Sequence, residues 1–385
     1  MNSIDSISKT FQEKFHRQPL IFIAPGRINL IGEHTDYNEG FVMPASIDKH
    51  MVFAIAPNGN SRCNIFAQDL EEGVTFSVQD AVPGETWVNY LMGVLDAFER
   101  RGLPVGGVDC VFGGNIPAGA GLSSSAALCS GFGFAINEIF NAKATLLDLA
   151  RIAQYSEHEF AGLKCGIMDM YASLFGQKEQ ALLLDCRSNT HELLPVQLKG
   201  YSLLLIDTKV KHTLASSAYN DRRASCEEGV RIIRKQYPQV HSLRDVTRVM
   251  LYEHQDQLGE DTFIKCLFIV EEIERTQKAG EWLKKGDLRS FGNLMYETHW
   301  GLSQAYEVSC EELDFLVALA EEEKDQIIGA RMMGGGFGGC TINLIATDRI
   351  GAFSEKIKAN YFATFKKEPD FYPVNIAEGV HQLKD

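Results

Sequence analysis

Short apolar segments alternate with longer amphipathic ones along the chain. Strand-like apolar runs lie at 20–24, 108–112, 181–184, 201–206 and 342–346. Between several of these runs, apolar residues instead recur every three or four positions, the spacing of one helical face. The alternation predicts a protein of mixed α and β structure.

The length of the chain predicts more than one domain. It has 385 residues, and a single hydrophobic core usually serves no more than about 250–300. The segment 185–200 holds Pro195 between two strand-like runs, so we expect domains at 1–195 and 196–385. The segment 217–285 is strongly charged with a helical pattern, typical of solvated surface helices, and we assign it no chemistry.

Charge and composition exclude several classes of protein. The chain carries 51 acidic and 37 basic side chains, a net charge of −14 with histidine neutral. Binding to nucleic acid requires a basic face, so we expect no such partner. Hydrophobic residues at 45% and charged residues at 23% are typical of a compact globular protein. No apolar run approaches the ~18 residues of a membrane span, and residues 1–20 lack the apolar core of a signal peptide, so we expect a cytoplasmic protein with no membrane partner.

The cysteines suggest no covalent framework. There are nine of them, scattered singly, and no two stand in a C-x-x-C pair. This pattern indicates neither a set of disulfides nor a zinc site.

A loop rich in glycine and serine is the first candidate for a binding site. Residues 113–125 read GGNIPAGAGLSSS and lie between a strand-like run and an amphipathic helix. Such a turn exposes backbone N–H groups and the positive end of a helix dipole, for which phosphate is the natural ligand. Gly119 and Gly121 permit close approach of a ligand, and Ser123 is predicted to cap the helix. A capped helix with a flexible entry loop is the open alternative, and the Walker A pattern is absent.

Two carboxylates stand in apolar surroundings. In the helix predicted from Thr145, whose start signal includes Asp148, Glu157 continues the apolar stripe. A buried, ionised acid needs a cation or several donors, and magnesium is one candidate. Asp169 lies among apolar residues in CGIMDMYASLFG, and held near an arginine it could accept a proton from a substrate hydroxyl. An alternative stays open for each acid. In one, the helix ends near Ser156 and leaves Glu157 solvated; in the other, Asp169 is simply an acid in the first turn of a helix, where the helix dipole stabilises it.

The segment 24–44 concentrates polar groups among apolar ones. Its sequence APGRINLIGEHTDYNEGFVMP holds Arg27, Glu33, His34 and Asp36 within ten residues. Carboxylates accept paired hydrogen bonds from vicinal hydroxyls, which is how a sugar is oriented, and a permanent cation can polarise a phosphate. A charged turn is the competing interpretation for any one of these residues, and it is weaker for the four together.

A second glycine run, MMGGGFGGC, lies within 330–346. Gly334, Gly336 and Gly339 match the dinucleotide pattern G-x-G-x-x-G, but a strand rather than a helix follows them, so we discount that interpretation. We expect this loop to pack closely against another loop or a ligand, with a plain turn as the alternative.

Four motifs stand in order along the chain: PGR…GEHTDY, PAGAGLSSSAAL, CGIMD and GGGFGGC. Together they resemble the GHMP family of small-molecule kinases over nearly the whole chain. GEHTDYN, with ASSAYNDRR at 215–223, is similar to the members of that family that phosphorylate galactose at O1 with ATP, the first committed step of the Leloir pathway. The resemblance implies an α+β fold of two domains, an N-terminal α/β domain like domain 2 of ribosomal protein S5 and a ferredoxin-like C-terminal domain, with the active site between them.

The same resemblance implies roles for individual residues. Asp169 would be the base for the anomeric hydroxyl of the sugar, and Arg27 would stabilise the transferring phosphoryl group. Magnesium would arrive with ATP and be held by Ser125 and Glu157. The expected partners are galactose and MgATP, and a monomer is expected. The implied sugar contacts are Glu33, His34, Thr35, Asp36 and Tyr219, and the implied ATP contacts are Trp87, Gly119, Ala120, Gly121, Leu122, Ser123, Ser124 and Ser125.

Two positions depart from the pattern of the galactose-phosphorylating relatives. Met170 stands where glutamine is usual, and Met333 where threonine is usual. Met170 follows the proposed base directly, which puts a polar contact near the sugar in doubt. We expect both changes to be tolerated, with reduced activity or a shifted sugar preference as the alternative at Met170. Two other functions stay open: a kinase for N-acetylgalactosamine, arabinose or galacturonate, and a regulator that binds sugar and ATP without catalysis. The intact Arg27, Asp169 and serine loop count against the regulator.

Overall fold

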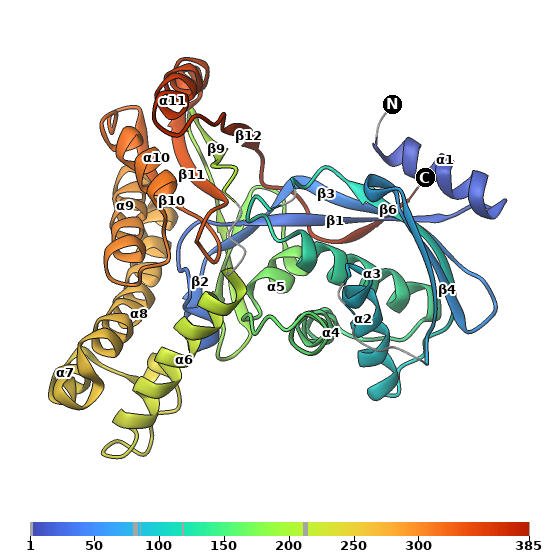
Figure 1. Ribbon diagram of the computed structural model, residues 1–385, viewed down its shortest axis with the longest axis horizontal. Coiled ribbons are helices and arrows are strands. Elements are labelled where there is room, and N and C mark those ends of the chain that lie inside the picture. The colour runs from blue at the N-terminus through green and yellow to red at the C-terminus, as the bar shows by residue number, and fades with distance from the viewer. Residues whose placement is uncertain (1–2, 80–83, 85, 118, 211–214, 385) are drawn as a thin grey trace.

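The computed structural model describes residues 3–79, 84, 86–117, 119–210 and 215–384. Its strands form three sheets, with helices packed on their faces (Figure 1). Each of the five runs predicted from the sequence lies in a strand, so the expected mixture of α and β structure is confirmed. The strands are β1 (Leu20–Asn29), β2 (Phe41–Val42), β3 (Pro44–Pro57), β4 (Arg62–Ala67), β5 (Glu72–Ser77), β6 (Val108–Gly114), β7 (Gln180–Asp185), β8 (Thr190–Pro195), β9 (Tyr201–Asp207), β10 (Ile327–Met332), β11 (Cys340–Ala346), β12 (Asp370–Val374) and β13 (His381–Leu383).

The helices gather in two groups. Those on either side of the largest sheet come from the first half of the chain, and those around the four-stranded sheet come from the second half (Figure 1). The helices are α1 (Ser3–Phe15), α2 (Val88–Arg100), α3 (Ser124–Phe140), α4 (Leu146–Glu159), α5 (Met168–Phe175), α6 (Ala215–Ile233), α7 (Arg248–Glu253), α8 (Gln255–Lys285, with a break at Gly259), α9 (Leu288–Gln304), α10 (Glu311–Glu321) and α11 (Ile350–Phe365).

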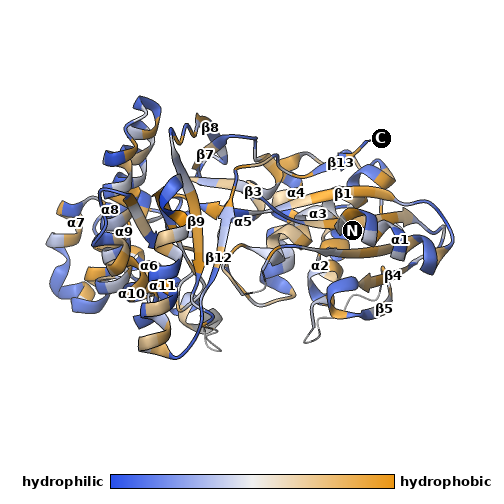
Figure 2. Cartoon of the chain, turned by 90° about the horizontal axis from the view of Figure 1, so that it is seen from above, coloured by the Kyte–Doolittle hydropathy of each residue, from blue (hydrophilic) through white to orange (hydrophobic). Residues whose placement is uncertain are grey.

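The largest sheet has the strand order β13-β1-β3-β6-β4-β5. Only β4 and β6 pair in parallel; the other neighbours are antiparallel. Helix α1 packs on one face of this sheet, while α3 and α5 pack on the other with α2 and α4 outside them (Figure 1). Since both faces are covered, β1 and β3 are largely apolar (Figure 2).

The four-stranded sheet, in the order β10-β11-β9-β12, is antiparallel throughout. One face packs on α9, α10 and α11 through residues such as Leu204 and Ile345. The other face, with Leu205 and Ile342, shares a core with Ile28 at the end of β1. The two halves of the chain are therefore joined by a continuous apolar contact, beside which the motifs meet.

The expected division into 1–195 and 196–385 stays a prediction. Strand β8 fills much of the proposed boundary region and pairs with β7. Near its end the chain returns to the first sheet, where β13 pairs with β1. The C-terminal half thus contributes an edge strand to the N-terminal sheet.

The segment 217–285 has the expected solvated face, because most charged side chains of α8 are exposed or half-buried. The opposite face of α8 packs against β2, β8 and α9, and buries apolar residues such as Phe268 and Ile269. Two charged side chains of this helix, Lys265 and Glu272, are also buried, which the charge pattern did not indicate.

Two further observations concern the whole described chain. No helix within it combines the length and apolar character needed to cross a bilayer. All nine cysteines are free thiols, and seven of them are buried. The expected cytoplasmic location and monomeric state stay predictions.

Candidate active site

Arg27 and Asp169, 142 positions apart in the sequence, form a two-pronged ion pair. Arg27 lies in β1 and Asp169 in the first turn of α5, and both joining distances, Nε to Oδ1 and Nη2 to Oδ2, are 2.8 Å. Burial by itself lowers the pKa of Arg27, but the carboxylates of Asp169, Glu33 and Asp36 together outweigh it and raise that pKa. The site therefore holds a permanent cation beside a carboxylate whose two oxygens are fixed in direction.

The glycine and serine loop meets this pair. It connects β6 to α3, and its Gly119 and Gly121 have φ of 77° and 74°, a left-handed region that favours glycine. Arg27 donates from Nη1 to the carbonyl of Gly121 at 2.6 Å and from its backbone N–H to Leu122 at 3.2 Å. Ala118, within the same loop, lies outside the described residues. The loop is thus held at its carbonyls, beside the helix start that was expected to bind phosphate.

Ser123 has a different role from the predicted helix cap. It occupies the position before α3, but at φ 57° its side chain makes no capping hydrogen bond. Its hydroxyl donates instead to Oδ2 of Asp169. The prediction of a cap was wrong because a carboxylate from a distant helix competes successfully for this hydroxyl.

Glu157 lies on the buried face of α4, as its place in the apolar stripe indicated. The capping box of Thr145 and Asp148 is present, and the helix continues to Glu159, so the alternative of an end near Ser156 is wrong. Glu157 is 2% exposed, and burial raises its pKa to about 7. The hydroxyl of Ser125 hydrogen-bonds to it. Among the described residues, no basic side chain lies within ion-pair distance of this carboxylate.

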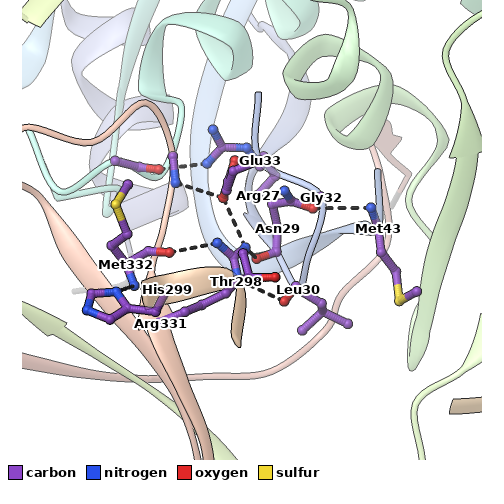
Figure 3. Close-up of polar contacts among 12 residues, drawn as sticks. Arg27, Asn29, Leu30, Gly32, Glu33, Met43, Thr298, His299, Arg331 and Met332 are labelled. Atoms are coloured by element: carbon purple, nitrogen blue, oxygen red, sulfur yellow. Dashed lines mark hydrogen bonds and ion pairs between the residues drawn. The ribbon is translucent and has the colours of Figure 1, made fainter. Parts of the chain in front are cut away.

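Glu33, in contrast, has two donors from the protein, one of them a guanidinium, on a single carboxylate oxygen (Figure 3). Its Oε1 accepts from Nη2 of Arg331 and from the backbone N–H of Gly334, both at 2.9 Å. Arg331 is completely buried in β10, and its Nε also donates to the carbonyl of Leu30 at 2.9 Å. One charge from the C-terminal half therefore anchors both the backbone and the side chain of the 24–44 segment.

A second buried charge holds the same turn. Glu272 in α8 is fully buried and accepts from the backbone N–H of Gly32 at 3.0 Å and from the Thr298 hydroxyl at 2.9 Å. Burial raises the pKa of Glu272, while Arg275 forms an ion pair with it. The turn before Glu33 is thus fixed by groups that lie far away in the sequence.

Arg27, Asp169 and most of the predicted sugar contacts line one cavity of about 350 Å³. Burial, followed by the nearby charge of Asp169, raises the pKa of Asp36 in its wall to about 7. Acceptor and donor groups line it on several sides, a composition suited to a small polyhydroxylated ligand. The lining residues are Arg27, Glu33, His34, Asp36, Leu163, Cys165, Met168, Asp169, Tyr219 and Gly334, Gly335 and Gly336.

Several predicted residues do not line this cavity: Thr35, Trp87, Glu157 and those of the loop at 119–125. Thr35 is buried, and its hydroxyl donates to the carbonyl of Phe41 at 2.6 Å. Trp87 precedes α2, where its ring nitrogen donates to Glu72 at 2.9 Å and its ring packs edge-on against Phe112. The roles of these residues in binding stay predictions.

The two departures from the motif pattern lie in the core. Met170 is fully buried among the helices below the first sheet and does not line the cavity. Met333 is also buried, and its backbone N–H donates to Cys340 at 3.0 Å. Neither residue lines the cavity, which agrees with the expectation that both changes are tolerated.

The second glycine run packs against the glycine and serine loop, as expected. An added Cβ on Gly339 would lie 3.5 Å from the carbonyl carbon of Ala120, and one on Gly121 would lie 3.4 Å from the carbonyl oxygen of Met333. The sequence did not indicate that this run also forms part of the cavity wall. It did contain a signal for Arg331, an arginine within the apolar strand IIGARM, although it did not show the partner.

Comparison with known families agrees with this geometry. The galactokinase galactose-binding signature matches residues 9–57, the N-terminal domain of GHMP kinases matches 89–177, and their C-terminal domain matches 281–363. These matches contain Arg27, Glu33, Glu157, Asp169 and Arg331. The three models therefore cover most elements of the site.

Individual relatives are similar over the whole length. A galactokinase of Thermotoga neapolitana is 40% identical over 94% of this chain and 99% of its own, and one of Clostridium acetobutylicum is 36% identical over the full length of both. The crystal structure of Lactococcus lactis galactokinase complexed with galactose superposes with a TM-score of 0.94 at 31% identity, covering 98% of this chain and 99% of that one. A mevalonate kinase shares the fold, with a TM-score of 0.62 at 17% identity and coverage of 93% of this chain and 100% of its own. The chain belongs to the galactokinase family of GHMP kinases.

Proposed function

We propose that the protein transfers the γ-phosphoryl group of ATP to O1 of α-D-galactose, giving galactose 1-phosphate and ADP. The observation that carries this proposal is the Arg27–Asp169 pair, which stands in the wall of the cavity together with Glu33 and Asp36 and touches the glycine and serine loop. A sugar hydroxyl in the cavity and a phosphate on the loop would meet at this pair. The galactokinases among the relatives support the choice of sugar and nucleotide.

The pair supplies a proton acceptor and a positive charge at one point. Asp169 keeps its carboxylate orientation through Arg27 and Ser123, so a lone pair of the carboxylate can accept the O1 proton as the new P–O bond forms. Arg27 balances the charge that develops on the transferring phosphoryl group. Phosphoryl transfer depends on alignment and charge neutralisation more than on covalent chemistry, and both are built into this geometry.

The sugar would be held by carboxylates with directed acceptor atoms. Both donors of Glu33 are bound to Oε1, which leaves Oε2 for a substrate hydroxyl. Asp36 receives the backbone N–H of Tyr37 on Oδ1 at 2.9 Å and keeps further lone pairs for the ligand. Two carboxylates in fixed orientation can distinguish the arrangement of hydroxyls on a hexose ring.

Magnesium fits the groups near the loop. Ser125 and Glu157 offer a hydroxyl and a buried carboxylate that lacks a cation, and magnesium usually takes one or two protein carboxylates with the rest of its shell from phosphates and water. The described residues contain no cluster of three or more His, Cys, Asp or Glu side chains, which suits an ion shared with a nucleotide. When bound, the ion would neutralise charge on the phosphates.

An assay of ADP release with a panel of sugars tests the proposal. We expect turnover with ATP and galactose, and little with N-acetylgalactosamine, arabinose or galacturonate. A different preferred sugar would assign the protein to another substrate, and release of ADP with none of them would indicate a regulator that has lost catalysis.

A further inference from the structure

His34 lies beside three tyrosine side chains, and the mechanism proposed above gives none of these four side chains a role. Its side chain is 4% exposed, and its ring centroid lies 5.8 Å from that of Tyr37, 5.1 Å from Tyr219 and 5.0 Å from Tyr306. Its backbone φ is 61°, a conformation that is strained for a residue with a side chain. Such strain persists only where surrounding contacts dictate the placement, so the ring is held in a defined position.

A chain of hydrogen bonds leads away from His34 into the C-terminal half. Nδ1 of His34 and the hydroxyl of Tyr37 are 2.8 Å apart, and the hydroxyls of Tyr37 and Tyr306 are also 2.8 Å apart. The chain ends at Cys226 in α6, whose sulfur is 3.3 Å from the Tyr306 hydroxyl. Three segments distant in sequence thus meet in one line of polar atoms.

Tyr306 is a rigid end for this chain. It is fully buried, and its ring lies 5.1 Å from that of Phe268. Nε of Arg222 donates to its backbone carbonyl at 2.8 Å. Tyr306 begins the YEVSC segment that follows α9, a motif without a role in the chemistry described above.

The direction of the hydrogen bonds follows from the relative strengths of donors and acceptors. Burial lowers the pKa of His34 to about 4, so near neutral pH the ring is uncharged and carries one N–H. A phenol is a better donor than a neutral imidazole N–H, and an imidazole nitrogen is a better acceptor than a phenol oxygen or a thiol sulfur. The favoured order therefore runs from the Cys226 thiol through Tyr306 and Tyr37 to Nδ1 of His34, which places the ring proton on Nε2.

Nε2 is the free end of the ring. It is buried and has no partner of normal hydrogen-bond geometry among the described residues. The backbone of Gly335, in the cavity wall, acts as a neighbouring acceptor that raises the pKa of the ring, and it competes with a ligand for the ring proton. His34 also lines the cavity, where Glu33 and Asp36 offer carboxylate acceptors and the N–H groups of Arg27 are directed to Asp169 and Gly121. A neutral donor complements this set, because a sugar hydroxyl needs both an acceptor and a donor.

We propose that Tyr37 and Tyr306 are positioning residues whose hydroxyls hold His34 in the Nε2–H tautomer, so that it donates a hydrogen bond to a hydroxyl of the bound sugar. The identity of this ligand rests on the proposed function. The tautomer itself is a property of the protein without ligand.

Nitrogen-15 NMR of the histidine rings tests the tautomer without any turnover. The resonances of His34 are identified by their loss in His34→Gln. We expect the protonated nitrogen to be Nε2 in the unmodified protein, and a mixture of tautomers in Tyr37→Phe and Tyr306→Phe. The matched control is Tyr361→Phe, since Tyr361 is fully buried and donates to the carbonyl of Thr208 at 2.8 Å, away from His34. A proton on Nδ1 in the unmodified protein, or an unchanged ring spectrum in both relay variants, would overturn the proposal.

Kinetics test the consequence for the sugar. Loss of one well-formed hydrogen bond is worth about 1 kcal/mol, so Tyr306→Phe should raise the KM for galactose ~5-fold while kcat and the KM for ATP stay within ~2-fold. In the His34→Gln background, Tyr306→Phe should add nothing, since it acts through the ring. A KM shift no larger than that of Tyr361→Phe, or one that persists without His34, contradicts the relay. If galactose is not turned over while the Nε2–H tautomer is observed, the proposed substrate fails and the relay stands; galactose that leaves the His34 resonances unchanged refutes the sugar contact.

Discussion

Glu33 and Glu157 are equally buried, at 2% exposure each, but of the two only Glu33 forms an ion pair with a basic side chain among the described residues. Glu33 receives the guanidinium of Arg331 and a backbone N–H, both on one oxygen. Glu157 receives the Ser125 hydroxyl and a distant thiol, Cys165, at 3.8 Å, and burial raises its pKa to about 7. Glu33 lies in the 24–44 segment, and Glu157 lies near Ser125 at the start of α3.

The difference shows which charges the fold balances by itself. A carboxylate that orients a neutral sugar must be ionised and fixed before the ligand arrives, so its counter-charge is part of the protein. A carboxylate that is to hold a metal ion needs no counter-charge from the protein, because the ion supplies it. The distribution of donors therefore distinguishes Glu33 from Glu157, although Asp36, in the cavity wall, also has a pKa raised to about 7. Four experiments test this distinction.

The largest effect is expected at the Arg27–Asp169 pair. Asp169→Ala removes the proton acceptor and the partner of Arg27, and we expect turnover to fall by ~10³-fold or more while nucleotide binding persists. Steady-state ADP release and calorimetric titration with ATP measure the two quantities. Ser173→Ala is the matched control, because Ser173 lies on the same helix but donates to Pro25 at 2.8 Å outside the cavity. Unchanged turnover in Asp169→Ala would remove its assigned role.

Arg331→Met, which removes the counter-charge of Glu33, should destabilise the protein strongly. It leaves Glu33 as a buried charge without its cation and the carbonyl of Leu30 without its donor, a loss of ~3–5 kcal/mol in the free energy of unfolding. Denaturant unfolding measures it. Arg331→Met combined with Glu33→Leu should recover part of the loss, because no isolated charge is then buried. A cost below ~1 kcal/mol for the single variant would show that Glu33 does not depend on Arg331.

Glu157 should make the ligand-free protein less stable as pH rises. Its pKa is raised in the fold from 4.5 to about 7, so its favourable contribution is complete below pH 4.5 and is lost as pH rises through about 7. The shift corresponds to an upper bound of ~3 kcal/mol between these limits. Glu157→Gln should flatten the curve of unfolding free energy against pH, and MgATP should do the same for the unmodified protein.

In Glu157→Gln, the pKa of Asp36, raised to about 7, leaves a residual slope in the curve of unfolding free energy against pH. Asp36→Asn measures this residual separately. An unchanged slope in Glu157→Gln would mean that its charge is already balanced, and would remove the distinction between the two acids.

The smallest effect on the site is expected from Met170→Gln, which restores the glutamine usual in the similar motifs. Met170 is buried in the core, so an amide there lacks partners and should cost ~1–3 kcal/mol of stability. The KM for galactose should not change, because the side chain does not line the cavity. Met170→Leu serves as the control for packing. An altered sugar preference in Met170→Gln would show that this position communicates with the cavity.

Local features of the fold followed from the sequence. The helix start at Thr145, the five apolar strands and the buried place of Glu157 all depend on spacing within a few residues, and the structure confirms them. Spacing also indicated the solvated face of α8, but it did not indicate that Glu272 of this helix is buried. Glu272 is buried there because Gly32 and Thr298, distant in the chain, supply its donors.

The candidate site was predictable in its members more than in their contacts. The motifs pointed to Arg27, Asp169 and Glu33. Nothing in the sequence indicated that Ser123 donates to Asp169 rather than capping its own helix. The sequence showed Arg331 as a charged residue in an apolar strand. Its ion pair with Glu33, 298 positions away, could be recognised only in the structure.

What the sequence determined by itself is the set of elements, the chemical character of each motif and the family to which the chain belongs, because these depend on local periodicity and on the order of residue types. Which charged side chains pair, and which lack a counter-charge, depends on the tertiary fold. Whether a carboxylate such as Glu33 or Glu157 is balanced depends on burial and on donors from distant segments, and both are set by how the two halves of the chain pack together.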